Sequence, residues 1–185
     1  MNFRRLLITI LLAGTVAALA QPQARAQAFG PSGTTTLSVV VGPEAAIQIN
    51  TSTSSLTASG STFTNDFTGT TAFTYKVRTT KTGGTGNIGV QVTSDFSPGS
   101  GPSVASPPST GDTLSYTCTV TSPGTGCTGS QNASTTASTS VATFGADAHS
   151  AKAGNTGSVS WDLTNDPKYG TGTYTATVTF TISAT

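Results

Sequence analysis

The clearest feature of the chain is a strict alternation of polar and apolar residues over residues 173–185. Threonine or serine occupies every second position, and the positions between them are apolar. Such an alternation places the apolar side chains on one face of a β-strand and the hydroxyls on the other. It is typical of a sheet with one buried and one solvated face. The large apolar residues of this strand are Tyr174, Val178, Phe180 and Ile182.

Similar short alternating segments recur along the chain and predict further strands. A glycine-rich turn separates residues 71–79 from residues 88–92, so we expect these two strands to form a hairpin. With the last strand, the chain carries about eight strands, separated by long loops of Ser, Thr, Gly and Pro. The pattern predicts an all-β fold, an antiparallel β-sandwich, and the long irregular loops disfavour the competing closed barrel. The remaining predicted strands are residues 34–41, 46–49, 114–120, 141–144 and 158–163.

The N-terminus has the features of a secretion signal. Arg4 and Arg5 precede an apolar run, residues 6–18, that is too short to cross a bilayer. Small-residue cleavage patterns end at Ala20 and at Ala28, and the second is favoured because the apolar run extends nearly into the first. A retained membrane anchor is the alternative to cleavage.

Cleavage after residue 28 leaves residues 29–185, which we expect to form a single exported domain without a transmembrane anchor. Its location would be extracellular or the cell surface, with the periplasm as a further compartment. Five Lys and Arg then remain against seven Asp and Glu, so the formal charge changes from +1 to −2. Nucleic acids and anionic membranes are bound by clustered cations. The five cations are scattered along the sequence, which argues against both partners: Lys76, Arg78, Lys81, Lys152 and Lys168.

The two cysteines, Cys118 and Cys127, are expected to form a disulfide, because an exported protein meets oxidising conditions. Pro123 and Gly124 lie between them and indicate a turn, so the bond would close the end of a hairpin. For so short a loop, the chain-entropy description gives about 2.5 kcal/mol of stabilisation. A metal-binding or reactive pair is the alternative, but the spacing is not CxxC and no histidine lies nearby.

No catalytic or metal-binding constellation stands out, so we expect no enzyme activity and no cofactor. His149 is the only histidine, and Asp147 and Ser150 are close to it in sequence, but no nucleophile-elbow motif is present. Asp162 and Asp166 flank a predicted turn. A calcium site there is one interpretation, and turn capping by Asp166 is the favoured one, so no metal is predicted.

Two aromatic residues are candidates for contact with a glycan. Trp161 is the only tryptophan, and it shares a strand face with Val159 and Leu163, which favours a place in the core. Tyr169 lies in the adjoining turn and is the better surface candidate. The threonine ladder of the last strand could also face a flat ligand, although threonine is in any case a favoured residue for an exposed strand face.

The end of the chain resembles the subunits of bacterial chaperone–usher pili. These subunits end in a strand of alternating apolar residues with a glycine upstream and an aromatic residue next to last. The alternating apolar residues are matched here by Val178, Phe180 and Ile182, and the upstream glycine is matched by Gly172. The next-to-last residue, however, is Ala184 and not an aromatic residue.

This resemblance implies an incomplete immunoglobulin-like sandwich that is completed by the N-terminal extension of a neighbouring subunit. Residues 29–41, with Leu37, Val39 and Val41 on one parity, resemble such a donor strand. The last strand, through Val178, Phe180 and Ile182, would then be the acceptor edge. The implied partners are copies of the same chain or other surface subunits.

A second resemblance is to the WxL domains of bacterial surfaces, which attach to cell walls. Trp161, Asp162 and Leu163 match their Trp-x-Leu motif, and Phe180 and Ile182 stand where their second Trp and Leu would be.

The sequence therefore predicts a non-catalytic secreted or cell-surface protein that has a structural or adhesive role and assembles by strand donation. The alternative is a binding module for glycans or cell-wall polymers.

Overall fold

The computed structural model describes residues 30–60 and 62–185. The predicted signal, residues 1–28, lies outside the described residues. Residues 40–185 form one compact unit, and residues 30–43 contain no strand.

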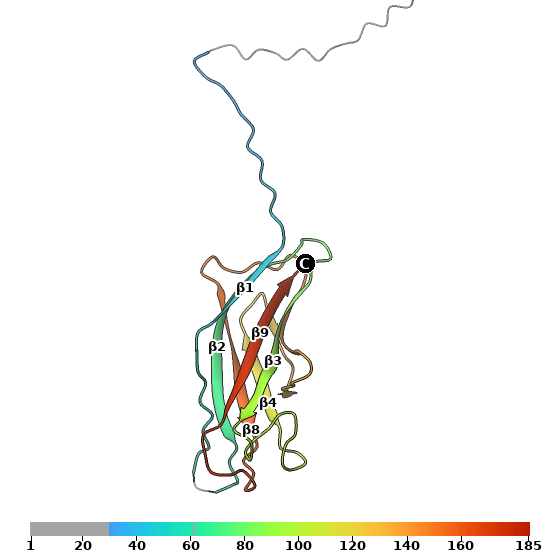
Figure 1. The fold of residues 1–185 in the computed structure, drawn as a ribbon. Helices are drawn as coiled ribbons and strands as arrows, with labels where there is room; N and C mark the ends of the chain where they lie inside the picture. Colours follow the sequence, from blue (N-terminus) through green and yellow to red (C-terminus); the bar gives the residue numbers. More distant parts are fainter. Residues whose placement is uncertain (1–29, 61) are drawn as a thin grey trace, which may run out of the picture. The chain divides into compact units, whose positions relative to one another are not determined.

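The described residues form nine strands and no helix, which confirms the all-β prediction. The strands pair antiparallel in two sheets, one of order β1-β2-β8-β4-β6 and one of order β5-β7-β3-β9 (Figure 1). The two shortest strands, of two residues each, lie in segments without an alternating pattern. The strands are β1 (Glu44–Ile49), β2 (Phe67–Arg78), β3 (Gly86–Ser97), β4 (Leu114–Val120), β5 (Thr125–Gly126), β6 (Gln131–Asn132), β7 (Thr139–Phe144), β8 (Asn155–Leu163) and β9 (Thr175–Ala184).

The core lies between the two sheets and is built mostly from alternate residues of the longer strands. In β2, Phe73, Tyr75 and Val77 are buried, as their alternation with polar residues predicts. The Tyr75 ring lies 5.2 Å from the Phe144 ring of the opposite sheet. The Tyr75 hydroxyl donates to the carbonyl of Thr121, so its one polar atom is satisfied.

Two expectations about the early strands are wrong. Residues 34–41 form no strand, because their backbone pairs with no strand of the described chain. β2 and β3 do not form a hairpin, because they lie in different sheets. Residues 79–85 cross from one sheet to the other, and seven residues are longer than the usual hairpin loop.

The disulfide between Cys118 and Cys127 is confirmed, with the two Cα atoms 5.4 Å apart. Cys118 lies in β4, and Cys127 directly follows β5 in the other sheet. The bond therefore links the two sheets on the side of the sandwich where β5 and β6 are the edge strands. Both of those edge strands have only two residues, and each pairs with only two residues of its neighbour, β6 with β4 and β5 with β7.

Candidate functional site

The side of the sandwich away from the disulfide is formed by the two edge strands β1 and β9. Within the described residues, β1 pairs only with β2 and β9 pairs only with β3. The two edge strands contact each other but share no ladder of backbone hydrogen bonds. Each of them therefore presents a row of backbone N–H and C=O groups without strand partners.

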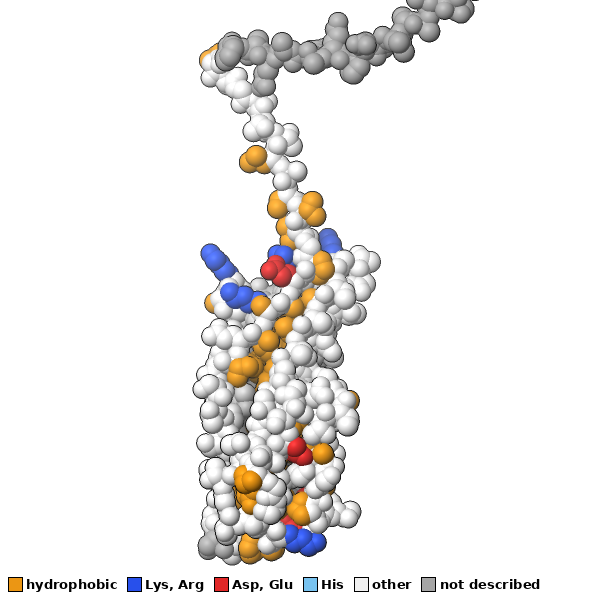
Figure 2. Space-filling view, viewed as in Figure 1, with side chains coloured by type: hydrophobic (Ala, Val, Ile, Leu, Met, Phe, Trp, Pro, Cys, Tyr) orange, Lys and Arg blue, Asp and Glu red, His pale blue; other side chains and the backbone are white. Residues whose placement is uncertain are grey.

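An apolar seam runs along this side between the two strands. Figure 2 shows the hydrophobic side chains gathered in a strip over β1 and β9. All of the side chains of the seam are partly buried against the core except that of Ile49, which is 38% exposed. The seam consists of Ala45, Ile47 and Ile49 of β1 and of Ala176, Val178, Phe180 and Ile182 of β9.

The alternation of β9 explains how the seam forms. Every threonine of β9 is exposed, and every apolar residue between them is half-buried. The Phe180 ring lies 5.9 Å from the fully buried Phe73 ring and covers it. The predicted acceptor residues Val178, Phe180 and Ile182 therefore lie at a sheet edge, with their side chains towards the core and their strand open to pairing.

The predicted donor residues are among the most exposed large hydrophobic residues of the described chain. Leu37 is 90% exposed and Val39 is 84% exposed, and Val41 is exposed as well. An aliphatic side chain buried from such a position gains about 1.5–3 kcal/mol. Three apolar side chains at alternate positions are thus available for burial on a partner surface.

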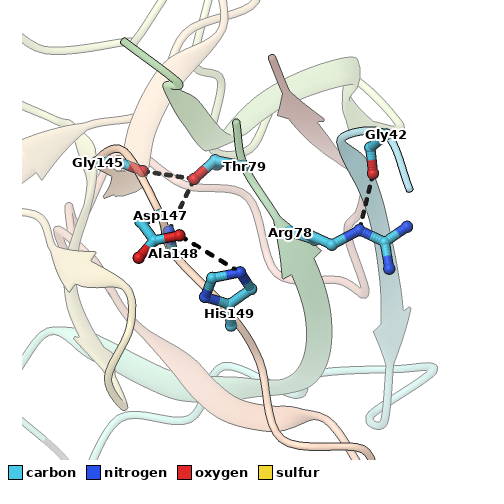
Figure 3. Close-up of polar contacts among 7 residues, drawn as sticks. All are labelled: Gly42, Arg78, Thr79, Gly145, Asp147, Ala148 and His149. Atoms are coloured by element: carbon cyan, nitrogen blue, oxygen red, sulfur yellow. Dashed lines mark hydrogen bonds and ion pairs between the residues drawn. The ribbon is translucent and has the colours of Figure 1, made fainter. Parts of the chain in front are cut away.

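His149 and Asp147 form a surface contact at the end of β2 (Figure 3). The His149 Nε2 atom lies 3.7 Å from the Asp147 Oδ1 atom, and both side chains are more than half exposed. The nearby Ser150 hydroxyl accepts a hydrogen bond from the backbone N–H of Val77 at 2.8 Å, so it holds the loop to β2. The three side chains do not form a base–nucleophile relay in this arrangement.

The loop that carries His149 is fixed to β2 by Thr79. The Thr79 hydroxyl donates to the carbonyl of Gly145 at 2.7 Å and accepts from the N–H of Ala148 at 2.8 Å. On the other side of the strand end, the Arg78 Nε atom donates to the carbonyl of Gly42 at 2.7 Å (Figure 3). These bonds tie the start of β1 and the loop before β8 to one strand end.

The ring of Trp161 is buried, so the prediction that Trp161 contacts a glycan is wrong. It is 5% exposed, and its ring lies 5.4 Å from the buried Tyr116 ring. Its indole N–H donates to the Thr71 hydroxyl at 2.8 Å. A sugar could stack on Trp161 only if the core opened, which agrees with the interpretation from its strand parity.

Tyr169 lies half-buried in the turn before β9. Its hydroxyl is buried and has no hydrogen-bond partner in the part of the chain that the structure describes. Burial, followed by the negative charges of Asp112 and Asp166, raises the pKa of Tyr169 above its usual value. The ring therefore offers only part of its surface to a ligand, and its hydroxyl offers none.

Asp162 and Asp166, the residues considered for calcium, belong to two different carboxylate pairs. Burial and the neighbouring Asp66 raise the pKa of Asp162. Burial and Asp166 likewise raise the pKa of Asp112. Across residues 30–60 and 62–185, no three His, Cys, Asp or Glu side chains come close enough together to hold a metal ion. Asp166 caps its turn, as the sequence indicates, by accepting from the N–H of Lys168 at 2.6 Å.

The cations are less scattered than the sequence suggests. Lys76, Arg78 and Lys152 line one hollow together with His149, at the end of β2 where β1 begins. The basic residues come from β2 and from the loop before β8, which are far apart in sequence, so no run of Lys or Arg predicts the hollow.

The sequence alone also did not indicate that β1 forms half of the seam. The strand at residues 46–49 is predicted, but its place beside β9 depends on contacts across more than a hundred residues of sequence. The alternation of Ala45, Ile47 and Ile49 was the available signal for it.

The fold and the seam define the protein as an all-β protein of two antiparallel sheets with one open side. Comparison of the chain with protein-family models, with curated protein sequences and with solved structures finds no match. No helix among the described residues has the length and hydropathy to cross a bilayer. We therefore infer the function from the geometry of the seam and from the sequence before β1.

Proposed function

We propose that this chain is a non-catalytic, exported structural subunit of the cell surface whose copies assemble by strand donation. In this proposal the fold is an incomplete immunoglobulin-like sandwich. Residues 34–41 of one copy add to the open edge of β9 in another copy, and their apolar side chains cover the seam. The observation that carries the proposal is the unpaired, ten-residue β9 edge beside a partly exposed apolar seam.

The dimensions of the donor and acceptor segments agree. Eight extended residues span about 26 Å, and the ten residues of β9 span about 33 Å. The donor segment would thus cover most of the edge and leave one or two residues of β9 unpaired. Leu37, Val39 and Val41 would point to the seam, because alternate residues of a strand share a face, and Val40 would point to solvent.

The parity of the donor segment gives a matched pair of variants. Val39→Asp places a charge on the seam side, whereas Val40→Asp adds the same charge at the neighbouring position on the solvent side. We expect Val39→Asp to weaken self-association by at least about 30-fold, which corresponds to about 2 kcal/mol of lost apolar burial. We expect Val40→Asp to associate like the unmodified chain.

The measurement is sedimentation of residues 29–185 over a dilution series, with a chain that lacks residues 29–41 as the non-donating reference. We expect the truncated chain to be monomeric and to bind a synthetic peptide of residues 34–41. Equal association of the two Asp variants, or a monomer for the full and the truncated chain alike, would refute strand donation between copies.

A binding module for glycans or cell-wall polymers is the second candidate, and a hydroxyl-lined hollow favours it. The hollow lies on the outer face of the five-stranded sheet and is lined by residues of β2, β4 and β8, among them Thr68, Ser115, Ser160 and Asp162. Trp161 lies beside this hollow, so a change of its fluorescence on titration with polysaccharide would support this function. An unchanged signal with an assembling chain would favour the structural role.

A further inference from the structure

The charged side chains of the described chain gather at the two ends of the sandwich. The middle of every strand is uncharged, so the flat faces consist of hydroxyl and apolar side chains. At the end where β1 begins, four cations stand against two carboxylates, a formal charge of +2: Lys76, Arg78, Lys81 and Lys152 with Glu44 and Asp147. At the other end, one cation stands against five carboxylates, a formal charge of −4: Lys168 with Asp66, Asp95, Asp112, Asp162 and Asp166.

Strand registry establishes which residues share an end. Glu44 pairs with Arg78 at the basic end, and Gly86 pairs there with Ala184. At the acidic end Phe67 pairs with Leu163, and the loops that follow β3 and β8 meet where the N–H of Gly170 donates to the carbonyl of Ser100. Figure 2 shows Lys and Arg side chains around an acidic one at the upper end of the sandwich, and Asp or Glu side chains together with a basic one towards the lower end.

Most of the charge at each end is left without an opposite partner. At the basic end, Arg78 contacts Glu44 at 3.0 Å, whereas Lys76 and Lys152 make no ion pair within the described residues. At the acidic end, the carboxylates lie near one another, Asp162 beside Asp66 and Asp112 beside Asp166. Each end therefore carries an electrostatic potential that a surface of the opposite sign would relieve.

The donor segment is joined to the basic end by a short connection. Only Gly42 and Pro43 stand between residues 34–41 and the start of β1 at Glu44, and two extended residues span about 7 Å. When residues 34–41 lie along the seam of another copy, the basic end of the donating copy must lie close to the end of the acceptor where the donor strand enters.

The direction of the donor strand depends on the end of the acceptor at which this strand enters the seam. β9 runs from the acidic end at Thr175 to the basic end at Ala184. A donor that enters at the acidic end runs antiparallel to β9, and one that enters at the basic end runs parallel to it. The second arrangement would bring two basic ends together within about one Debye length, about 8 Å at physiological salt.

We propose that consecutive copies stack head to tail, with the basic end of the donating copy against the acidic end of the accepting copy, so that the donor strand runs antiparallel to β9. This inference rests on the proposed strand donation and names its direction and its second contact surface. The attraction between the ends guides the donor strand to one entrance of the seam.

The test compares two charge reversals of the same kind at opposite ends. Lys152→Glu and Lys168→Glu change the net charge of the chain equally, but only Lys152→Glu weakens the basic end. At about 50 mM salt we expect Lys152→Glu to slow association by about tenfold and Lys168→Glu to associate at least as fast as the unmodified chain. Stopped-flow light scattering of residues 29–185 measures both rates, and added salt should remove the difference.

Disulfide cross-linking between introduced cysteines measures the direction of the donor strand relative to β9. In mixtures of copies, Val40→Cys, which lies on the solvent side of the donor strand, should cross-link to Thr177→Cys near the acidic end of β9 and not to Ser183→Cys near the basic end, because both of these β9 residues face solvent. Equal slowing by both charge reversals, or cross-linking to Ser183→Cys, would overturn the head-to-tail inference. If Val39→Asp in addition leaves association unchanged, strand donation itself fails, so the two failures are distinguishable.

Discussion

The hydrogen bond between Trp161 and Thr71 gives a direct test of the interior of the sandwich. The indole N–H of Trp161 donates to the Thr71 hydroxyl at 2.8 Å, and the two residues are only 5% and 6% exposed. Thr71→Val replaces the hydroxyl by a methyl group of similar size, so it removes the acceptor without a cavity. A buried donor that loses its partner costs about 1–3 kcal/mol.

We expect Thr71→Val to lower the free energy of unfolding by about 2 kcal/mol, which for a domain of this size lowers the melting temperature by about 4–8 °C. Thr71→Ser keeps the acceptor and loses one methyl group, at a cost of about 0.8 kcal/mol. Because Trp161 is the only tryptophan, its fluorescence during urea unfolding measures both variants.

A double-mutant cycle with Trp161→Phe separates the hydrogen bond from the packing of Thr71. Phenylalanine has no N–H, so in that background Thr71→Val should cost about 1 kcal/mol less by circular dichroism than in the unmodified chain. The cost that remains includes the hydrogen bond between the Thr71 and Ser54 hydroxyls, which lie 2.6 Å apart. Equal costs of Thr71→Val in both backgrounds would refute a buried indole bonded to Thr71. The same result would restore Trp161 as a candidate glycan contact.

Two further predictions concern packing and pH. Gly157→Ala would force a Cβ atom into the Phe73 ring, so we expect a loss of about 1–3 kcal/mol, whereas Gly99→Ala meets nothing within 4 Å and should stay within about 0.5 kcal/mol by thermal unfolding. Burial would raise the pKa of Asp95, but hydrogen bonds from Ser103 and from three backbone N–H groups lower it below its usual 3.8. The stabilisation that Asp95 supplies is therefore present above that value and lost as the pH falls through the lower folded pKa. Asp95→Asn should destabilise the fold at neutral pH and match the unmodified chain in acid, and a pH-independent difference would contradict this reasoning.

The strands were predictable from the sequence because their alternation is local. Phe73, Tyr75 and Val77 specify the buried face of β2 without reference to any other part of the chain. The sheet that a strand joins is decided by contacts distant in sequence, and the predicted hairpin of β2 and β3 failed for this reason. β5 was not predicted because a two-residue strand has no period to detect.

The candidate site was predictable only in part. Val178 and Phe180 were placed on the apolar face of an edge strand by the same alternation, and β9 is an edge of its sheet. The opposite wall, with Ile47 of β1, follows from the folded arrangement. The hollow that gathers Lys76 and Lys152 was likewise hidden, because seventy-six residues separate them in sequence and the loop before β8 brings them together.

The edge strands on the two sides of the sandwich differ in how well they are protected against pairing with another strand. This contrast supports the assembly that we propose. Soluble proteins protect sheet edges with short strands, prolines, charged residues or covering segments. One side here has two-residue edge strands and the link from Cys118 to Cys127. The other side has β9, which contains ten residues without a proline or a charge, and four of them are threonine, a strong strand former. An edge of this kind favours the addition of another strand, and the exposed Leu37 and Val39 are suited to supply it.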